Sequence, residues 1–363
     1  MLDSVALRPD ANVSHDPRLS DLQGTPNLSS NEAYSPRGLL VHNSIQTDER
    51  RLERAAILCT SVRRFAKYAT RPRVYIIGRS EEAGNRIKQE CKALNPEGTF
   101  VFIQRDTSLM RNVDAVCDEI RKKEEEVNLL FLTIGTLEVD GNTEEGLHYA
   151  SALTIYARNR FIVNLLPLLQ QAQSLRRVVS VYCATYEGQI RMDDFQAASL
   201  GLMAKQGHTA SVTTLALEAH HQSAPEVSFV RNFPGSVKSG IDRGSIGPLM
   251  RTLKIIFLLL APLVDIPLEQ AGDRHLSLCT SARYSVGPED EAAGVPLTDG
   301  LALARGSDGR VGSGVYSIDA YGESASAKVE RLLANFRTEG VVERVRDAIE
   351  ADINGALASD KHR

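Results

Sequence analysis

Cysteine is scarce in this sequence of 363 residues, and its cysteines are not paired by spacing. The chain has five of them, an odd number, and none forms a C-x-x-C motif. A disulfide framework and a structural zinc site are therefore not expected. We expect a reducing compartment inside the cell instead. The cysteines are Cys59, Cys91, Cys117, Cys183 and Cys279.

An excess of positive charge is also missing. The formal net charge is -4, and 42% of the residues are hydrophobic. Nucleic acid is therefore not expected as the main partner, because phosphate binding usually requires a basic surface. No carboxylate or cysteine lies at ligand spacing from the adjacent His220 and His221, so no metal site is predicted. The length fits one large domain or two small ones.

The chain lacks an apolar run long enough to cross a bilayer. Its most apolar stretch, LMRTLKIIFLLLAPLV at 249–264, contains Arg251 and Lys254. We expect this stretch to be a buried or pocket-lining helix; the alternative is a lid, over about 240–272, that rests on a membrane or grips an apolar substrate. The first residues, MLDSVALRPDANVSHD, are polar and unlike a signal peptide. A cytoplasmic protein without an integral membrane segment is predicted.

The main positive feature is a repeated alternation of strand and helix patterns. Residues 1–48 are rich in Ser, Asn, Asp and Pro, and are predicted to be a disordered or foreign N-terminal extension. Over 49–325, apolar runs such as RVYIIG and VNLLFLTIG alternate with amphipathic helix patterns. This alternation predicts a doubly wound α/β domain with a parallel sheet, followed by a helical tail over 326–363. Ligands of such sheets lie beyond the C-terminal strand ends.

Several motifs follow one another along this region. They are PRVYIIGRS, VNLLFLTIG, RFIVNLLPLL, RRVVSVY, TTLALE, VSFVRNFPG and GSGVYSID. In this order they resemble the short-chain dehydrogenase/reductase family, and more narrowly its atypical members from fungal natural-product gene clusters. The resemblance implies a Rossmann-like fold and an NADP-dependent oxidoreductase. It also implies a small apolar substrate, such as a polyketide or terpenoid intermediate in secondary-metabolite biosynthesis, and leaves a homo-oligomer open.

The resemblance assigns cofactor-binding roles to residues at the strand ends. Arg79 would hold the 2′-phosphate of NADP, because a guanidinium offers several donors in a planar fork. Asp106 would accept a hydrogen bond from the adenine amine, and Gly135 would let the backbone approach the ribose. Pro234 and Gly235 would pass beside the nicotinamide. A surface arginine and a helix-capping aspartate are the structural alternatives for the first two residues.

The glycine-rich phosphate loop of the family is not recognisable in this sequence. No glycine lies between Val41 and Ile77, and LCTS at 58–61 stands where the resemblance would place the loop glycines. The first strand and the loop are therefore expected to be degenerate or missing. The segment RGLLVHNSI, at 37–45, is the only candidate for that strand within the N-terminal extension.

The catalytic group of the family is incomplete as well. The family uses a tyrosine as proton donor, a lysine four residues later, a serine and an asparagine. Counted back from Glu218 in TTLALE, the lysine is Lys205, which would bind the ribose hydroxyls, and the tyrosine position is Gly201. The serine position falls near Cys183, and the asparagine position falls at Thr154. A solvated lysine is the structural alternative for Lys205.

A replacement proton donor is expected directly after the strand RRVVSVY. Tyr182 and Tyr186 are the candidates, while Cys183 would need a positive neighbour to lower its pKa. Three functions stay compatible with the sequence. The chain is an NADP-dependent reductase, a non-redox catalyst of cyclisation or isomerisation in the same cleft, or an inactive scaffold. The reductase is favoured because the retained residues all belong around one dinucleotide.

Overall fold

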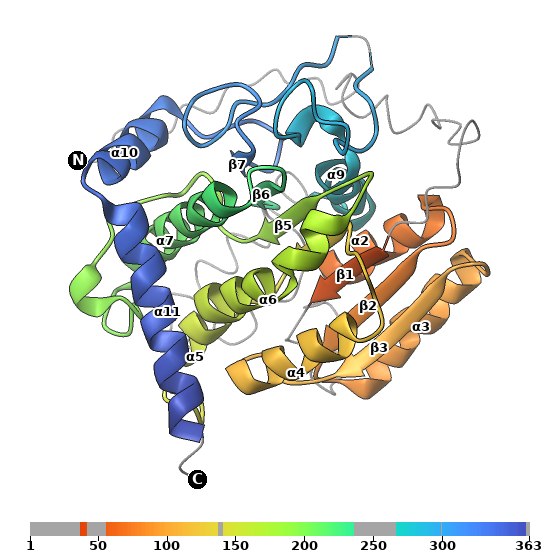
Figure 1. Cartoon of the computed structure of the whole chain (residues 1–363), viewed down its shortest axis with the longest axis horizontal. Coiled ribbons are helices and arrows are strands. Elements are labelled where there is room, and N and C mark those ends of the chain that lie inside the picture. Colours follow the sequence, from red (N-terminus) through yellow and green to blue (C-terminus); the bar gives the residue numbers. More distant parts are fainter. Residues whose placement is uncertain (1–36, 42–55, 137–140, 236–265, 299, 361–363) are drawn as a thin grey trace, which may run out of the picture.

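A single sheet of seven parallel strands forms the centre of the molecule (Figure 1). The computed structural model describes residues 37–41, 56–136, 141–235, 266–298 and 300–360. The strands are β1 (Arg37–Val41), β2 (Arg73–Gly78), β3 (Thr99–Gln104), β4 (Leu129–Leu132), β5 (Arg177–Val181), β6 (Ser228–Asn232) and β7 (Val315–Ile318). Their order is β3-β2-β1-β4-β5-β6-β7, and every pair is parallel. This order confirms the predicted doubly wound α/β fold.

The first strand is present, which corrects the expectation that it is degenerate or missing. Strand β1 pairs with β2 on one side, where Leu39 lies opposite Tyr75, and with β4 on the other, where Leu40 lies opposite Phe131. The boundary between the N-terminal extension and the α/β domain, predicted after residue 48, therefore lies before residue 37, because 37–41 belong to the sheet. From the sequence, the phosphate loop is expected at 58–61, but these residues lie inside helix α2. A loop between β1 and α2 would therefore have to lie earlier in the chain than 58–61. Residues 42–55, between β1 and α2, lie outside the described residues.

Helices connect the strands and cover both faces of the sheet. They are α2 (Ala56–Tyr68), α3 (Glu81–Leu94), α4 (Met110–Arg121), α5 (Tyr149–Ser151), the π-helical turn η2 (Ala152–Tyr156), α6 (Ala157–Gln171), the 3₁₀ turn η3 (Met192–Asp194), α7 (Leu202–Ser223), α9 (Leu268–Thr280), the 3₁₀ turn η4 (Ala282–Tyr284), α10 (Ala327–Thr338) and α11 (Val341–Asp360). Ser80 caps α3 by accepting a hydrogen bond from the Ala83 amide at 3.3 Å.

Two hydrophobic cores lie on opposite faces of the sheet, because side chains alternate along each strand. On β2, Val74 and Ile76 join the core beneath α2, α3 and α9, whereas Tyr75 and Ile77 join the core beneath the other helices. The second core continues through α4, α6 and α7 into α10 and α11. Burial of these side chains supplies the main stabilising free energy of the fold.

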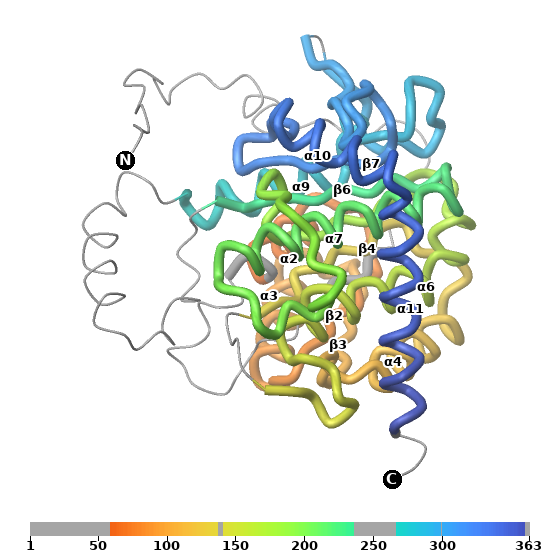
Figure 2. Tube along the Cα trace, turned by 90° about the vertical axis from the view of Figure 1, so that its left-hand side faces the viewer, coloured from red at the N-terminus to blue at the C-terminus, as the bar shows by residue number. Residues whose placement is uncertain are grey.

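The C-terminal helices pack on the main body of the protein. Figures 1 and 2 show α11 running across the helical layer, where it contacts α7, α4 and η2. Leu333 of α10 and Val345 of α11 are fully buried. The segment expected to be a helical tail, 326–363, therefore contributes two helices to the core of the α/β domain.

Most of the lid expected at about 240–272 lies outside the described residues, which resume at Ile266. The last residues of that range belong to α9, which packs against α2. Within the described parts of the chain, no helix combines the length and hydrophobicity needed to span a bilayer.

Candidate functional site

The sequence-predicted site residues gather at the C-terminal edge of the sheet. In a parallel sheet all strands end at the same edge, and the crossover helices begin there. Arg79, Gly135, Tyr182 and Pro234 each follow the end of a strand by one to three residues. Lys205 lies in the first turn of α7, the helix that returns the chain to the start of β6. The topology therefore places all five residues at one edge.

Arg79 and Asp106 face each other beyond the ends of β2 and β3. The Arg79 Nη1 atom lies 3.8 Å from Asp106 Oδ2, and the two side chains are 25% and 37% exposed. Arg79 Nη1 also donates to the Tyr149 hydroxyl at 3.1 Å. Asp106 Oδ1 accepts from the Ser108 amide at 2.9 Å, so this carboxylate both organises its turn and faces the arginine. The pair is partly exposed, and its charges remain accessible to a ligand.

Gly135 lies at the end of β4 beside Thr154 and Tyr182. A Cβ atom at Gly135 would be 3.9 Å from both the Thr154 Cγ2 atom and the Tyr182 ring, so no atom of the described residues crowds this face of the glycine. Thr154, at the position of the family asparagine, is buried in η2 and donates to the Ala150 carbonyl at 2.8 Å. Single π-helical turns within α-helices are frequent at functional sites. The open side of Gly135 is therefore available for a close backbone approach by a ligand.

The turn after β5 holds Tyr182 and Cys183 in a strained backbone. Cys183 has φ +32°, in the left-handed region that side chains with a Cβ rarely adopt. Tyr182 and Cys183 are adjacent in this turn, and Gln206 Nε2 donates to Cys183 Sγ at 3.6 Å. Burial raises the pKa of both side chains above the ordinary values for a phenol and a thiol. Both groups are therefore protonated at neutral pH.

Lys205 is partly exposed and adjoins the residue that contacts Cys183. Among the residues that the structure describes, none forms a hydrogen bond or ion pair with its ammonium group. Gly201, at the position of the family tyrosine, caps the helix with φ −64° and ψ 157°. A Cβ at Gly201 would meet no atom of the described part of the chain within 4 Å. A larger side chain would fit at this position, but glycine has no side chain that could donate a proton.

Tyr186 and the Pro234–Gly235 pair complete the predicted set. Tyr186 is 46% exposed and packs edge-to-face on Phe233, with ring centroids 4.9 Å apart. Gly235 has φ +78°, and a Cβ there would lie 2.7 Å from an Ile266 side-chain atom. Only glycine fits this conformation and this contact. Gly235 therefore has a structural reason to be glycine besides the nicotinamide contact expected from the sequence.

Two buried arginines next to Tyr182 were missed by the sequence analysis. Arg158 of α6 is 1% exposed, and Arg231 of β6 has no exposed surface. Arg231 Nη1 lies 3.3 Å from Glu187 Oε1, and both side chains of this ion pair are fully buried. Arg231 interrupts the apolar run VSFVRNF, and a charge within a buried strand is the signal that marks it. Arg158, on a helix with polar neighbours, carries no comparable signal.

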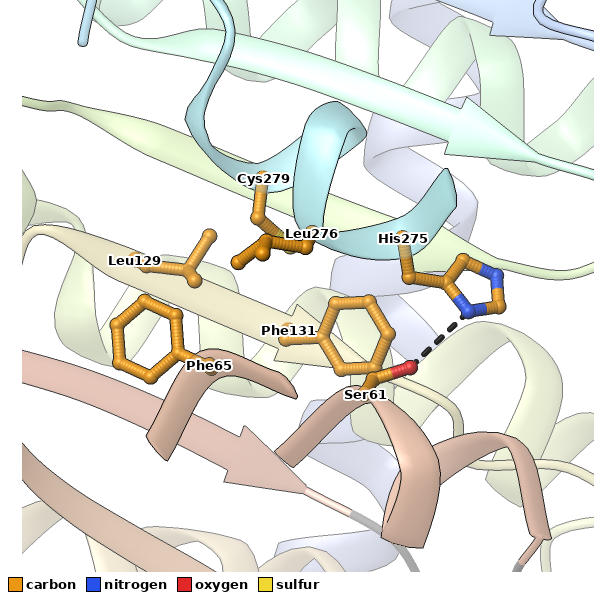
Figure 3. A pocket seen from close by; sticks show the side chains of 7 residues that line it. All are labelled: Ser61, Phe65, Leu129, Phe131, His275, Leu276 and Cys279. Carbon is orange, nitrogen blue, oxygen red and sulfur yellow. Dashed lines mark hydrogen bonds between the residues drawn. The ribbon is translucent and has the colours of Figure 1, made fainter. Parts of the chain in front are cut away.

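A second buried polar group lies on the other face of the sheet, next to a small pocket between α2 and α9 (Figure 3). Ser61 Oγ lies 3.0 Å from His275 Nδ1, and His275 Nε2 lies 3.2 Å from Asn232 Oδ1. The Asn232 amide donates to the Asp319 carbonyl at 3.0 Å, so its oxygen accepts from His275. Burial lowers the pKa of His275 to about 4. This neutral histidine joins α2 and α9 to the end of β6.

The cysteines and histidines of the described residues do not assemble a metal centre. No group of three or more His, Cys, Asp or Glu side chains in those parts of the chain is arranged to hold an ion. All five cysteines are free thiols, and only Cys183 is partly exposed. Cys183 is therefore the thiol that solvent or a ligand can reach most readily.

Known proteins resemble this chain over most of its length, although no protein-family model matches it. It is 35% identical over 303 residues to oxidoreductase AN1596 of Emericella nidulans, covering 82% of this chain and 90% of that protein. It is 33% identical over 289 residues to oxidoreductase andH of Emericella variicolor, covering 78% and 84%. It is 26% identical over 283 residues to short-chain dehydrogenase/reductase SAT2 of Stachybotrys chartarum, covering 73% and 79%.

Proposed function

The chain belongs to the short-chain dehydrogenase/reductase family, and on that basis we propose that it is an NADP-dependent oxidoreductase acting on a ketone or alcohol. The Arg79–Asp106 pair beyond β2 and β3 is the observation that carries this proposal. In this sheet order, the end of the strand after the first crossover helix is where the adenosine ribose of a dinucleotide binds. A guanidinium there favours the additional 2′-phosphate of NADP over the bare hydroxyl of NAD.

The described residues are suited to the adenosine half and the nicotinamide half of this cofactor. The partly exposed Arg79 would hold the 2′-phosphate, with Asp106 beside the adenine, and the uncrowded Gly135 would face a ribose. The ammonium of Lys205, which has no partner among the described residues, would hold the nicotinamide ribose, and Pro234 and Gly235 would lie along the nicotinamide. Residues 42–55, where the phosphate loop would lie, are outside the described residues. When bound, NADPH supplies a hydride to a carbonyl carbon.

Tyr182 is the proton donor in this proposal. The phenol O–H bond breaks, its proton passes to the carbonyl oxygen of the substrate, and Tyr182 is left as a phenolate. The adjacent Cys183 thiol, which is partly exposed, gives its own proton to the phenolate and regains one from solvent. A tyrosine at this position takes over the role that Gly201 cannot perform. Tyr186 is exposed and packs on Phe233, so it is the less suitable candidate.

The substrate in this proposal is an apolar polyketide or terpenoid intermediate in secondary-metabolite biosynthesis. The support is the apolar segment 249–264, which follows β6 later in the sequence, together with the similarity to the fungal oxidoreductases. The free thiols of the chain support a cytoplasmic location. A homo-oligomer is compatible with these observations, and they do not require one.

Cofactor binding is tested by titrating the purified chain with NADPH and NADH while following nicotinamide fluorescence. We expect tighter binding of NADPH, and we expect Arg79→Ala to weaken it by roughly 10- to 100-fold because a charge-assisted contact is lost. Arg105→Ala is the matched control, since Arg105 is exposed at the end of the neighbouring strand. Affinity for NADH should change little in either variant.

Turnover of a panel of apolar ketones with NADPH tests the proton donor. Tyr182→Phe should lower turnover by at least about 100-fold, as expected for loss of a general acid. Tyr186→Phe should leave turnover unchanged. No NADPH binding by a folded protein would exclude the reductase, and turnover of a substrate without nicotinamide would favour a non-redox catalyst. A chain with neither property would be an inactive scaffold.

A further inference from the structure

Arg158 carries a buried charge that has no carboxylate partner among the described residues. It lies in the first turns of α6, beneath the ends of β4 and β5, and is 1% exposed. Nε donates to the Ile134 carbonyl at 3.1 Å, and Nη1 donates to the Leu132 carbonyl at 3.2 Å and to Ser180 Oγ at 2.5 Å. Nη2 donates to the carbonyls of Ile134 and Val181. In the described structure no acidic side chain pairs with it.

These hydrogen bonds determine what Arg158 can do. Every guanidinium nitrogen already donates to the protein, so Arg158 has no nitrogen reserved for a substrate or phosphate. Burial lowers the pKa of Arg158 to about 9, so the group still carries its charge at neutral pH. Carbonyl dipoles offset only part of the cost of burying a charge. Part of the positive charge therefore remains uncompensated, and it acts on the groups adjacent to the guanidinium.

Tyr182 is that neighbour. The Arg158 Cζ atom lies 5.6 Å from the centroid of the Tyr182 ring. Arg231 approaches the same residue from β6, where its Nη2 donates to the Tyr182 carbonyl at 2.6 Å. Glu187 neutralises Arg231, with Oε1 at 3.3 Å from Nη1. Within the described parts of the chain, the buried charges around Tyr182 thus comprise two arginines and one carboxylate, which leaves one positive charge without a described counterion.

We propose that Arg158 is a positioning residue whose buried, fully hydrogen-bonded guanidinium stabilises the negative charge that Tyr182 acquires when it donates its proton. This proposal rests on the function proposed above, in which Tyr182 is the acid. The phenolate formed by proton transfer supplies the missing counter-charge for the site. In a poorly solvated site such a fixed charge acts more strongly than it would in water. The Arg158 guanidinium would then do for Tyr182 what the family lysine does for the family tyrosine, whose position in this chain is Gly201.

The charged and titratable groups that face Tyr182 all bear on this proposal. Arg158 on α6 and Arg231 on β6 both favour the phenolate, whereas burial and the adjacent Cys183 favour the neutral phenol. Gln206 of α7 reaches Cys183 and carries no charge. Removal of Arg158 should therefore make the phenol of Tyr182 harder to ionise. A role limited to tying together the ends of β4 and β5 would leave this ionisation unchanged.

Fluorine NMR of the full chain tests the proposal. The change Tyr182→3,5-difluorotyrosine makes the phenol more acidic and allows one tyrosine among ten to be observed. The pH midpoint of its chemical shift is compared between the otherwise unaltered chain and Arg158→Met. We expect the midpoint to rise by about one pH unit or more, because a nearby opposite charge shifts a pKa by that amount. Arg158→Gln, whose amide still donates to strand-end carbonyls, should give the same result.

Arg160→Met is the matched control. Arg160 lies two residues further along α6, pairs with Asp114 at 2.5 Å and is 24% exposed, so its loss changes the net charge equally. The midpoint should stay unchanged in Arg160→Met and return to the starting value in Arg158→Lys, which keeps the charge. A midpoint that does not respond to the loss of the Arg158 charge overturns the proposal. A midpoint that rises in Arg158→Lys or in Arg160→Met also overturns the proposal.

The same samples separate this proposal from the proposed function. The midpoint is measured without cofactor or substrate, so it does not depend on NADPH binding or turnover. NADPH titration of each variant should show unchanged affinity, because Arg158 contacts only the protein. Failure to bind NADPH with a shifted midpoint would disprove the reductase alone. NADPH binding with an unshifted midpoint would disprove the role of Arg158 alone.

Discussion

The two ends of one sheet edge hold their charges in different ways. At β2 and β3, Arg79 and Asp106 are 25% and 37% exposed and 3.8 Å apart. At β5 and β6, Arg158, Arg231 and Glu187 are buried, and the Arg231 Nη1–Glu187 Oε1 distance is 3.3 Å. One end keeps a loose pair of opposite charges near solvent, and the other keeps an excess of positive charge inside the protein.

This difference separates binding from catalysis. A partly exposed pair contributes little to stability and can exchange its partner for a ligand at little cost. A buried charge cannot exchange partners without a large penalty, but it provides a fixed field for nearby chemistry. The β2–β3 end therefore suits cofactor recognition, and the β5–β6 end suits stabilisation of charge that develops during a reaction.

The largest effect on stability is expected from Arg231→Met. This change leaves Glu187 buried without its cation, which should lower the free energy of unfolding by about 3–5 kcal/mol. Urea denaturation measures the difference. The control is Arg71→Met, because Arg71 and Glu97 form an ion pair whose side chains are 64% and 67% exposed. If Arg231→Met and Arg71→Met lowered the free energy of unfolding equally, the contrast between buried and exposed ion pairs would be wrong. Adding Glu187→Gln to Arg231→Met should recover part of the lost free energy of unfolding.

A smaller effect should come from the protonation of His275. Its pKa is lowered to about 4 in the folded protein, so the unfolded chain binds this proton first as the pH falls. The stabilising contribution is complete above the ordinary pKa of histidine and is lost as the pH falls toward 4. Between pH 7 and pH 5 the loss should be roughly 2 kcal/mol. Urea denaturation at both values should show a smaller difference for His275→Leu than for the unaltered chain.

The strained turn after β5 predicts an effect of about 1 kcal/mol. Cys183 has φ +32°, where a Cβ is unfavourable and glycine is not. Cys183→Gly should therefore be more stable than Cys183→Ala by about 1 kcal/mol, since both changes remove the same thiol. Thermal denaturation of the two variants measures this difference. If Cys183→Ala were as stable as Cys183→Gly, the turn in the alanine variant would have relaxed out of the left-handed region.

The smallest effect on stability is expected from Arg79→Ala. Loss of a partly exposed pair should change the free energy of unfolding by about 0.5 kcal/mol or less. The same variant should lose most of its affinity for NADPH, as described above. A large loss of stability in urea denaturation would show that Arg79 serves the fold, and the contrast between the two ends of the edge would then disappear.

Part of the site was predictable because it lies at strand ends. Short apolar runs that end in a glycine or a polar residue located Arg79, Gly135 and Tyr182 correctly at the sheet edge. Strand β1 was assigned to an extension instead, because four apolar or small residues, 38–41, within 48 mostly polar ones gave a weak local pattern. Its pairing with both β2 and β4 depends on segments far along the chain.

The sequence by itself determined the alternation of strands and helices, the parallel sheet and the positions of the strand ends. These features follow from local periodicity, which every short segment carries on its own. Only the tertiary structure decided that Arg158 lies beneath Tyr182, that Arg231 pairs with Glu187, and that β1 enters the sheet. Those outcomes depend on long-range packing and on exclusion of water, because a charge becomes a fixed internal field only after distant elements have closed around it.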